Sequence, residues 1–256
     1  MAVNQEPRLS RTYLDVVHAL AQHSLLLFDG NDKVRLQQDV RNHLRYYKSD
    51  LEGALQDQHT PPPSFNSLLL RHLGSPFYSV SALTLAHLTV TNIAYRTIAG
   101  ECPDIGKADL DRILMAWIQS FANAFAIDSN LAHGIRVKAA GHQLSGGLDA
   151  TAGFSRQTQE FLRERVPNID RVFQVFAEVL CHANAGHAGR FIDPNKLSLT
   201  LATEERRWYQ CSHCASVSPI EWWGYCTVCL ASGVTAVNPG ATDYLRARKA
   251  FFRDPV

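Results

Sequence analysis

The sequence predicts a mainly α-helical protein in which a helical domain is followed by a small four-cysteine module and a terminal helix. Three observations indicate this fold class. Apolar residues recur at helical spacing through most of the first 190 residues, an alternating apolar and polar pattern follows, and four of the six cysteines then form two Cys-x-x-Cys pairs. We therefore expect two domains, residues 1–190 and residues 191–256.

Length and composition are those of a folded protein with a hydrophobic core. The chain has 256 residues, of which 46% are hydrophobic. Its 25 Lys and Arg residues and 24 Asp and Glu residues leave a net charge of +1, so attraction to nucleic acid must come from a local patch. The polar N-terminus lacks the apolar core of a secretory signal, and runs such as Leu25–Phe28 are too short to cross a bilayer. We expect a cytoplasmic protein without a membrane partner.

The beginning of the chain should form two helices and a linker. Ser10–Phe28 repeats apolar residues at helical spacing and should end at Gly30. A second helix over Asn31–Tyr47 carries many charged and amide side chains, which indicates a solvated surface. Three consecutive prolines, Pro61–Pro63, then predict an extended linker near residues 59–64.

Four further helices are expected before residue 190. A short one over Phe65–Leu73 and a longer one over Ser79–Ile98 are each followed by a glycine that should stop them. Asp109–Ile127 is the clearest amphipathic segment, with apolar residues at i, i+3, i+4 and i+7, and should be a core helix. Pro167–Leu180 begins with residues that suit a first helical turn and continues with an apolar face.

The last part of the chain has a different pattern. Leu197–Leu201 alternates apolar and polar residues, which predicts a strand leading into the cysteine-rich segment. Ala241–Phe252 is expected to form a basic terminal helix.

Cys211, Cys214, Cys226 and Cys229 have the spacing of zinc ligands. Each Cys-x-x-Cys turn can hold two sulfur atoms on one side of a metal, and the eleven residues between the pairs can form a hairpin that brings the turns together. Four thiolates leave no open position on the metal, so we expect one structural Zn²⁺ in a zinc-ribbon-like module. The alternative, four buried free thiols, is weak because so short a segment could not form a core unaided. His213 is interpreted as a surface residue.

Aromatic and basic residues accompany the cysteines. Trp208, Tyr209, Trp222, Trp223 and Tyr225 can pack the module, which is the interpretation we favour, or can offer a stacking surface for bases. Trp222 and Trp223 are the candidates for stacking. From residue 206 onward the sequence contains six basic and three acidic residues. This local excess of positive charge allows either a weak phosphate-contacting patch or a helix that is merely solvated. The six are Arg206, Arg207, Arg246, Arg248, Lys249 and Arg253.

Catalytic signatures are not found. Gly100–Ala108 resembles a phosphate-binding loop but has five residues between its glycines instead of four and lacks the final Ser or Thr. In Cys181–His187 the histidines His182 and His187 are too far apart for a helical zinc site, and glycines interrupt the segment, so we expect a helix C-terminus with ordinary histidines. No small-molecule substrate is evident, and we expect that the chain alone is not an enzyme.

Several stretches of the sequence carry a family resemblance. FIDPNKLSLTL, RRWYQCSHC, YCTVC and DYLRARKAFFRDPV resemble the four-cysteine zinc module in the C-terminal half of large bacterial DEAD/DEAH-box helicases, including those of DNA repair and phage defence. The first 190 residues loosely resemble the helical region that precedes this module. No Walker A loop or other motor motif is present, so the resemblance implies a motor in the same or a neighbouring chain. The chain is then either a fragment of a helicase or a separate subunit.

Two functions follow as expectations. The first is an accessory region that holds or guides DNA for a helicase or translocase, in DNA repair or anti-phage defence, with zinc fixing the fold. The second is a protein-interaction adaptor that makes no contact with nucleic acid. Salt-dependent DNA binding separates the two.

Overall fold

The computed structural model describes residues 8–13, 15–16, 61, 63–75, 79–128, 130–144, 146–183, 189–203 and 207–238. The elements in chain order are η1 (Leu9–Arg11), α4 (Pro63–Gly74), β1 (Ala86–Val90), α5 (Asn92–Glu101), α6 (Lys107–Asn123), α7 (His133–Ala140), α8 (Arg156–Arg163), α9 (Ile169–Leu180), β2 (Cys181–Ala183), β3 (Arg190–Ile192), η3 (Pro194–Lys196), β4 (Leu197–Leu201), β5 (Trp208–Cys211), β6 (Val217–Ser218) and β7 (Val234–Val237). The helices expected over Asn31–Tyr47 and Ala241–Phe252, and most of the one over Ser10–Phe28, lie outside the described residues.

The mainly α fold class expected from the sequence is wrong. Of the residues that the structure describes, 44% are helical and 18% lie in strands or bridges. The strands form three small antiparallel sheets within these residues: β1 with β4, β2 with β3, and β5 between β6 and β7. The largest single error is the helix expected over Ser79–Ile98. Turns occupy its first part, β1 follows, and only α5, which begins after the N-cap Thr91, is helical.

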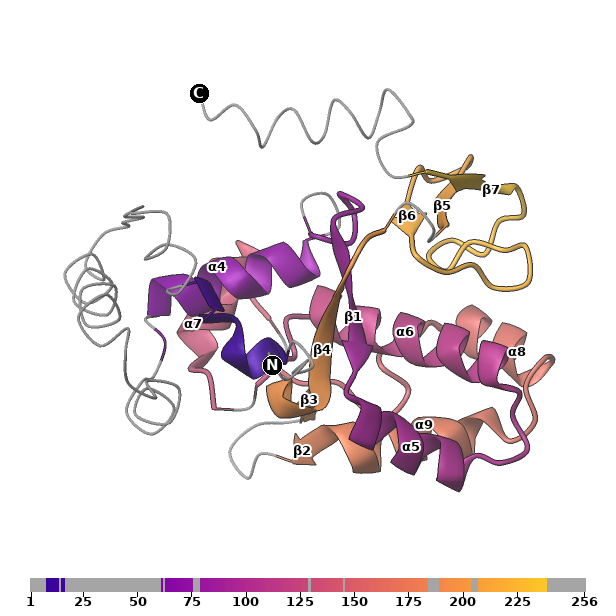
Figure 1. Ribbon diagram of the computed structural model, residues 1–256, viewed down its shortest axis with the longest axis horizontal. Helices are drawn as coiled ribbons and strands as arrows, with labels where there is room; N and C mark the ends of the chain where they lie inside the picture. Colours follow the sequence, from indigo (N-terminus) through magenta and orange to yellow (C-terminus); the bar gives the residue numbers. More distant parts are fainter. Residues whose placement is uncertain are drawn as a thin grey trace, which may run out of the picture.

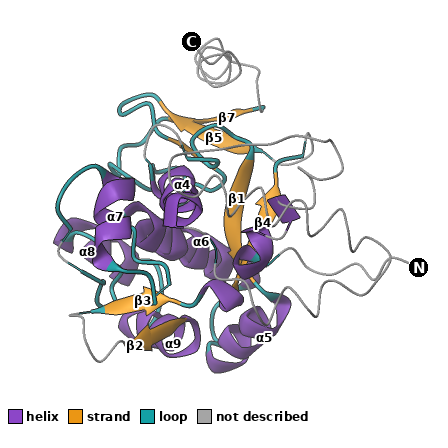
Figure 2. Ribbon diagram, turned by 90° about the vertical axis from the view of Figure 1, so that its left-hand side faces the viewer, coloured by secondary structure: helices purple, strands orange, loops and turns teal. Residues whose placement is uncertain are grey.

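The predicted core helix is confirmed as α6. Figure 2 shows α6 in the middle of the helices, with β1 and β4 beside it. Its apolar stripe is buried, and Ile113, Trp117 and Phe121 are 0% exposed. The indole N–H of Trp117 donates to the carbonyl oxygen of Ala150 at 2.8 Å, which satisfies the one polar atom of this side chain. α9 packs against this core and confirms the helix expected over Pro167–Leu180.

α4 confirms the helix expected over Phe65–Leu73, including its end at a glycine. Gly74 lies where α4 meets α6, and a Cβ atom at this position would collide with the carbonyl oxygen of Ala122. The glycine therefore allows a close approach of the two helices as well as ending the first. Pro63, expected in the linker, instead begins α4, because a proline is tolerated in the first turn of a helix.

The β1–β4 ladder joins segments that are far apart in the sequence. Five residues of β1 pair in register with five of β4, from Ala86 with Leu201 to Val90 with Leu197. On one face of the ladder the hydroxyls of Thr89 and Thr200 lie 3.1 Å apart. In Figure 1 the two strands run side by side, and β4 leads toward the module that carries the cysteines.

Contacts between strands and between core side chains continue across the domain boundary expected near residue 190. β3 pairs with β2, Ile192 forms a bridge with Ile127, and Phe191, Ile192 and Leu197 are buried in the same core as α6 and α9. The first strands of the segment expected to be a second domain thus belong to the helical body. We use "helical body" for the described residues 61–201 and "cysteine module" for residues 207–238.

The loop between α6 and α7 is held by a buried arginine that the sequence did not single out. Arg136 of α7 is 2% exposed, and its guanidinium donates to the carbonyl oxygens of Phe125, Ile127, Asp128 and Leu131. The guanidinium also lies over the ring of Phe191, 4.2 Å from its centroid. Burial lowers the pKa of Arg136, and the bonds to carbonyls compensate its desolvation.

None of the helices in the described part of the chain combines the length and the apolar character that crossing a membrane requires.

Candidate metal centre

The two Cys-x-x-Cys turns have the same local structure. In each turn the amide of the first cysteine donates to the carbonyl oxygen five residues later: Cys211 to Ser216 and Cys226 to Ala231, both at 3.0 Å. The residue after the second cysteine has a positive φ in both turns, 55° at Ala215 and 56° at Leu230. The chain therefore builds one turn twice, once after β5 and once before β7, and the two turns face each other.

Each turn also fixes its first sulfur atom with a backbone amide. The amide of His213 donates to Cys211 Sγ at 3.4 Å, and the amide of Val228 donates to Cys226 Sγ at 3.3 Å. His213 contributes its backbone and not its ring, and its side chain is exposed, as the sequence predicted.

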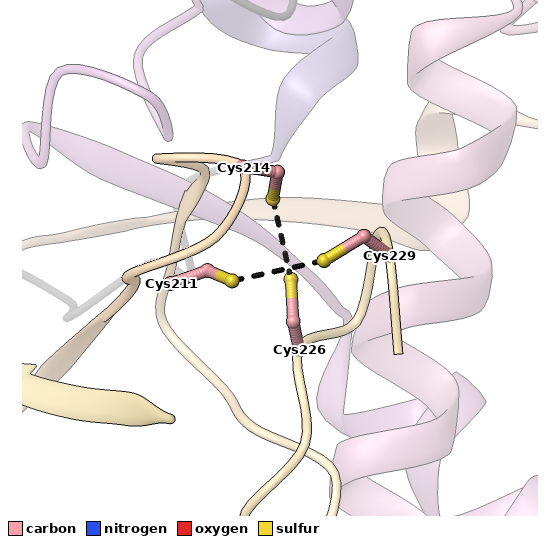
Figure 3. Close-up of side chains that lie close together, drawn as sticks. All are labelled: Cys211, Cys214, Cys226 and Cys229. Carbon is pink, nitrogen blue, oxygen red and sulfur yellow. Dashed lines mark hydrogen bonds between the residues drawn. The ribbon is translucent and has the colours of Figure 1, made fainter. Parts of the chain in front are cut away.

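The four sulfur atoms converge on one point. Figure 3 shows them directed inward, two from each turn. Cys211 Sγ and Cys229 Sγ are 3.7 Å apart, as are Cys214 Sγ and Cys226 Sγ, and all four lie within 4.8 Å of one another. A tetrahedral zinc with Zn–S bonds of about 2.3 Å requires sulfur separations of about 3.8 Å. The cysteines are thus positioned to hold a metal ion, and their geometry and chemistry fit zinc.

The surroundings of the cluster make it a partly covered site. Cys211 and Cys226 are buried, Cys229 is half-buried, and Cys214 is exposed. The hydroxyl of Ser216 lies 3.0 Å from Cys214 Sγ and 3.2 Å from Cys226 Sγ, so it touches sulfur atoms of both turns. With four protein sulfurs in the shell, a bound ion would have no position left for water or substrate, which is the arrangement of a structural site.

The thiols of the cluster differ in acidity. Burial raises the pKa of Cys214, but hydrogen bonds from the hydroxyl and amide of Ser216 and from neighbouring thiols outweigh it and lower the pKa to about 7. Burial raises the pKa of Cys226, and burial and the neighbouring thiols raise that of Cys229 to about 12. Cys214 therefore loses its proton more readily than Cys226 or Cys229, and a bound cation would favour the thiolate form of its ligands.

Trp222 anchors the cysteine module to the helical body. This side chain is 0% exposed and belongs to the main core. Its ring stacks on Phe161 of α8 at a centroid distance of 6.1 Å and meets Phe154 edge-on at 5.7 Å. The guanidinium carbon of Arg165 also lies over the ring of Phe161, 3.7 Å from its centroid. This stack of side chains places the second cysteine turn against α8.

A polar contact next to Trp222 fixes the module on α6. The indole N–H of Trp223 donates to Asp109 Oδ1 at 3.1 Å. Arg112, one turn along α6, pairs with the same carboxylate at 2.9 Å and with Glu221 of the module at 3.3 Å. Partly exposed ion pairs contribute only about 0–1 kcal/mol each, so the main effect of these contacts is to set the orientation of the module on α6.

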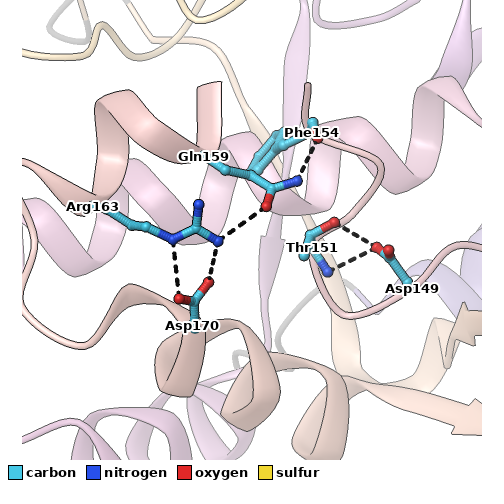
Figure 4. A network of polar contacts seen from close by, with 6 residues as sticks. All are labelled: Asp149, Thr151, Phe154, Gln159, Arg163 and Asp170. Carbon is cyan, nitrogen blue, oxygen red and sulfur yellow. Dashed lines mark hydrogen bonds and ion pairs between the residues drawn. The ribbon is translucent and has the colours of Figure 1, made fainter. Parts of the chain in front are cut away.

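A second polar network, shown in Figure 4, fixes the elements that hold Trp222. Gln159 Nε2 donates to the carbonyl oxygen of Phe154 at 2.8 Å, which sets the position of that residue relative to α8. Arg163 donates to Gln159 and makes a bidentate pair with Asp170, at 2.9 and 3.1 Å, so that α8 is tied to α9. The bond from Arg163 lowers the pKa of Asp170.

The residues predicted to contact nucleic acid differ in their burial, and most of them lie outside the described part of the chain. Trp222 is fully buried and offers no ring face to a base, so a stacking role for it is not supported. Trp223 is half-buried beneath Arg112, whose guanidinium carbon lies 5.8 Å from its ring centroid. Arg207 is exposed just before β5. The other predicted residues lie outside the described part of the chain: Arg206, Arg246, Arg248, Lys249 and Arg253.

The histidine segment differs from the helix end that the sequence predicted. α9 ends at Leu180, and His182 lies in β2, where its ring nitrogen Nε2 is 3.0 Å from Asp193 Oδ2. Burial raises the pKa of the adjacent thiol, Cys181, to about 12, so this thiol stays protonated near neutral pH. His187 lies outside the described residues.

Sequence reasoning missed the residues that position the metal centre. Phe161 stacks on Trp222, Arg165 lies over Phe161, and Asp109 and Arg112 contact Trp223, but all four come from segments more than forty residues from the cysteines. Their side chains carry no local motif. Only the amphipathic pattern of α6 indicated that a helix presents one face to the rest of the protein, and no helix was predicted over α8.

Comparison with known proteins gives one relative that extends over this whole region. Druantia protein DruE of Escherichia coli (strain UMEA 4076-1) is 29% identical over 269 aligned positions. The alignment covers 99% of this chain and 14% of that protein, so the chain spans about one seventh of the relative's length. No protein-family model and no solved structure matches the chain. The similarity therefore joins the helical body and the cysteine module in one homologous region.

Proposed function

We propose that this chain is a non-catalytic region that guides DNA for a helicase or translocase, with one structural zinc ion in the cysteine module. The observation that carries the proposal is the closed four-sulfur cluster clamped to the helical body by Trp222. A closed shell fits a structural metal. A module held on two helices suits a rigid surface that a nucleic acid strand follows.

The biological setting is proposed from similarity. The resemblance of the cysteine segment to helicases of phage defence and the likeness to Druantia protein DruE both support a role in anti-phage defence. Because the aligned region is 14% of that relative, we propose that a motor in the same or a neighbouring chain supplies ATP-driven movement. The chain described here would contribute contacts to the strand and no chemistry.

Salt-dependent binding tests the DNA-guiding role. The zinc-loaded chain is titrated into fluorescent single- and double-stranded oligonucleotides at several salt concentrations, and binding is followed by anisotropy. A slope of log K against log salt of about −0.7 per contacted phosphate is expected for single strands. Neutralising Arg207 together with Arg246, Arg248 and Lys249 should flatten the slope, whereas Lys138→Ala on the exposed side of α7 should not. Absence of binding at low salt would remove this function.

A protein-interaction adaptor is the second candidate, and exposed apolar side chains favour it. Leu85 is 47% and Leu201 is 69% exposed at the same end of the β1–β4 ladder, where Ala202 donates to the carbonyl of Leu85. The double variant Leu85→Ser and Leu201→Ser separates the two candidates. It should weaken assembly with the motor if the chain is an adaptor and should leave oligonucleotide binding unchanged if the chain guides DNA.

A further inference from the structure

A cavity of about 250 Å³ lies where the cysteine module meets the helical body. α6 forms its floor with side chains that recur every turn, Met115, Gln119 and Asn123. Residues 218–220 and 227–228 of the module form the opposite wall, the latter from the second cysteine turn. Because each side supplies a wall, the cavity has this shape only while the module is docked. Clefts at such junctions are common places for ligands.

The lining of the cavity selects a neutral, hydrogen-bonding ligand. No Lys, Arg, Asp or Glu is among the residues that line it. Amide and hydroxyl groups alternate with apolar side chains such as Met115, Ile220 and Val228. A phosphate or a carboxylate would find no opposite charge here. A flat ring with polar edges would find both apolar surface and hydrogen-bonding groups.

Two amides on the floor present a specific pattern. Gln119 Nε2 donates to Asn123 Oδ1 at 2.8 Å and to the carbonyl oxygen of Leu73 at 3.3 Å. Among the described residues, Gln119 Oε1 and Asn123 Nδ2 then have no partner. They offer one acceptor and one donor from neighbouring turns of α6. An acceptor beside a donor complements the edge of a nucleobase, because each base carries a hydrogen-bond donor next to an acceptor.

We propose that this cavity binds one unpaired nucleobase of a single-stranded nucleic acid. The proposal rests on the DNA-guiding function proposed above and names the site that holds a base. The volume lies below the range of roughly 300–1,000 Å³ of pockets for drug-sized ligands, which suits one ring system and not a whole cofactor. The base would come from a single strand, because removing a base from a duplex costs stacking and pairing energy.

The test compares an oligonucleotide that carries bases with one that carries none. The zinc-loaded chain is titrated with a poly(dT) strand and with a strand of the same length built only of abasic nucleotides, at constant low salt. A base held by a bidentate amide pattern should bind about 5- to 150-fold more tightly than the abasic strand. Asn123→Leu keeps the size of an exposed side chain and should remove most of this preference. Gln174→Leu, on the exposed side of α9, is the matched control and should keep it.

A second measurement keeps the site testable without oligonucleotides. Free adenosine is titrated into the chain while the side-chain amide signals of Gln119 and Asn123 are followed by NMR. If no oligonucleotide binds, the DNA-guiding function fails, and unmoved amide signals then overturn the base site as well. If oligonucleotides bind but the abasic strand binds as tightly as the poly(dT) strand, or if Asn123→Leu keeps the difference between them, only the base site is wrong. Amide signals that move only when a motor protein is added would also overturn it, in favour of a protein contact.

Discussion

The anchoring role of Trp222 predicts a large loss of stability in Trp222→Ala. The side chain is 0% exposed and contacts Phe154 and Phe161 through its ring. Replacing a buried tryptophan by alanine costs about 3–5 kcal/mol, and each aromatic contact accounts for about 0.5–1.5 kcal/mol beyond the buried area. We expect a loss of about 4 kcal/mol in the free energy of unfolding. That loss is a large part of the roughly 5–15 kcal/mol that holds a typical domain folded.

Urea unfolding of the zinc-loaded chain measures this loss. Circular dichroism reports the helical body, and a chromophoric zinc chelator reports the cysteine module. In the parent chain both signals should change in one transition, whereas in Trp222→Ala zinc should be released at lower urea than the helices unfold. Trp223→Ala is the control. It removes a half-buried ring and one hydrogen bond to Asp109, so it should cost only about 1–2 kcal/mol.

Coincident transitions and a loss below about 1 kcal/mol in Trp222→Ala would contradict the reasoning. They would mean that the ring contributes little to docking and that the module is held elsewhere. The hydrogen bond from Trp223 to Asp109 and the contact between Arg112 and Glu221 would then be among the contacts that hold it.

Three further predictions follow from single contacts. Metal analysis should give one zinc per chain, and Cys226→Ser should bring zinc content close to zero, since a buried ligand is lost; full occupancy in the variant would exclude the four-sulfur site. Arg136→Met should lower the free energy of unfolding by more than about 3 kcal/mol by leaving buried carbonyls without donors, whereas exposed Lys138→Met should change it by less than about 0.5 kcal/mol. Asp170, whose pKa is lowered in the folded state, adds stability above its ordinary pKa of 3.8 that is lost as pH falls through its folded value. Asp170→Asn should therefore flatten the acid limb of a stability profile, and an unchanged limb would show that the pair with Arg163 contributes nothing.

Local patterns predicted the elements whose signals are local. α4, α6 and α9 carry clear apolar spacing or capping residues, and the cysteine turns carry their ligands within four residues. β4 was predicted from its alternation alone. In each case the information that decides the structure lies within one or two turns of chain.

The helix predicted over Ser79–Ile98 was wrong at β1 because this strand depends on a partner that is distant in the sequence. Thr89 pairs with Ser198, which is 109 residues away, and no residue close to β1 signals this ladder. Strand formation is decided mostly by neighbours across the sheet, so a run that tolerates helix becomes a strand when a partner is present. The same cause hides the docking of the cysteine module, because Trp222 meets Phe161 across a distance in sequence that no motif spans.

The β1–β4 ladder decides where this protein can be cut. A truncation at residue 190 looks natural from the change in sequence pattern, yet it would leave β1 with an open, hydrogen-bonding edge and expose apolar residues that β4 covers. Such a fragment should aggregate for reasons unrelated to its role. Deletion mapping at this border would thus report on solubility of the pieces, and fragments meant to isolate either half must carry residues 86–90 and 197–201 together.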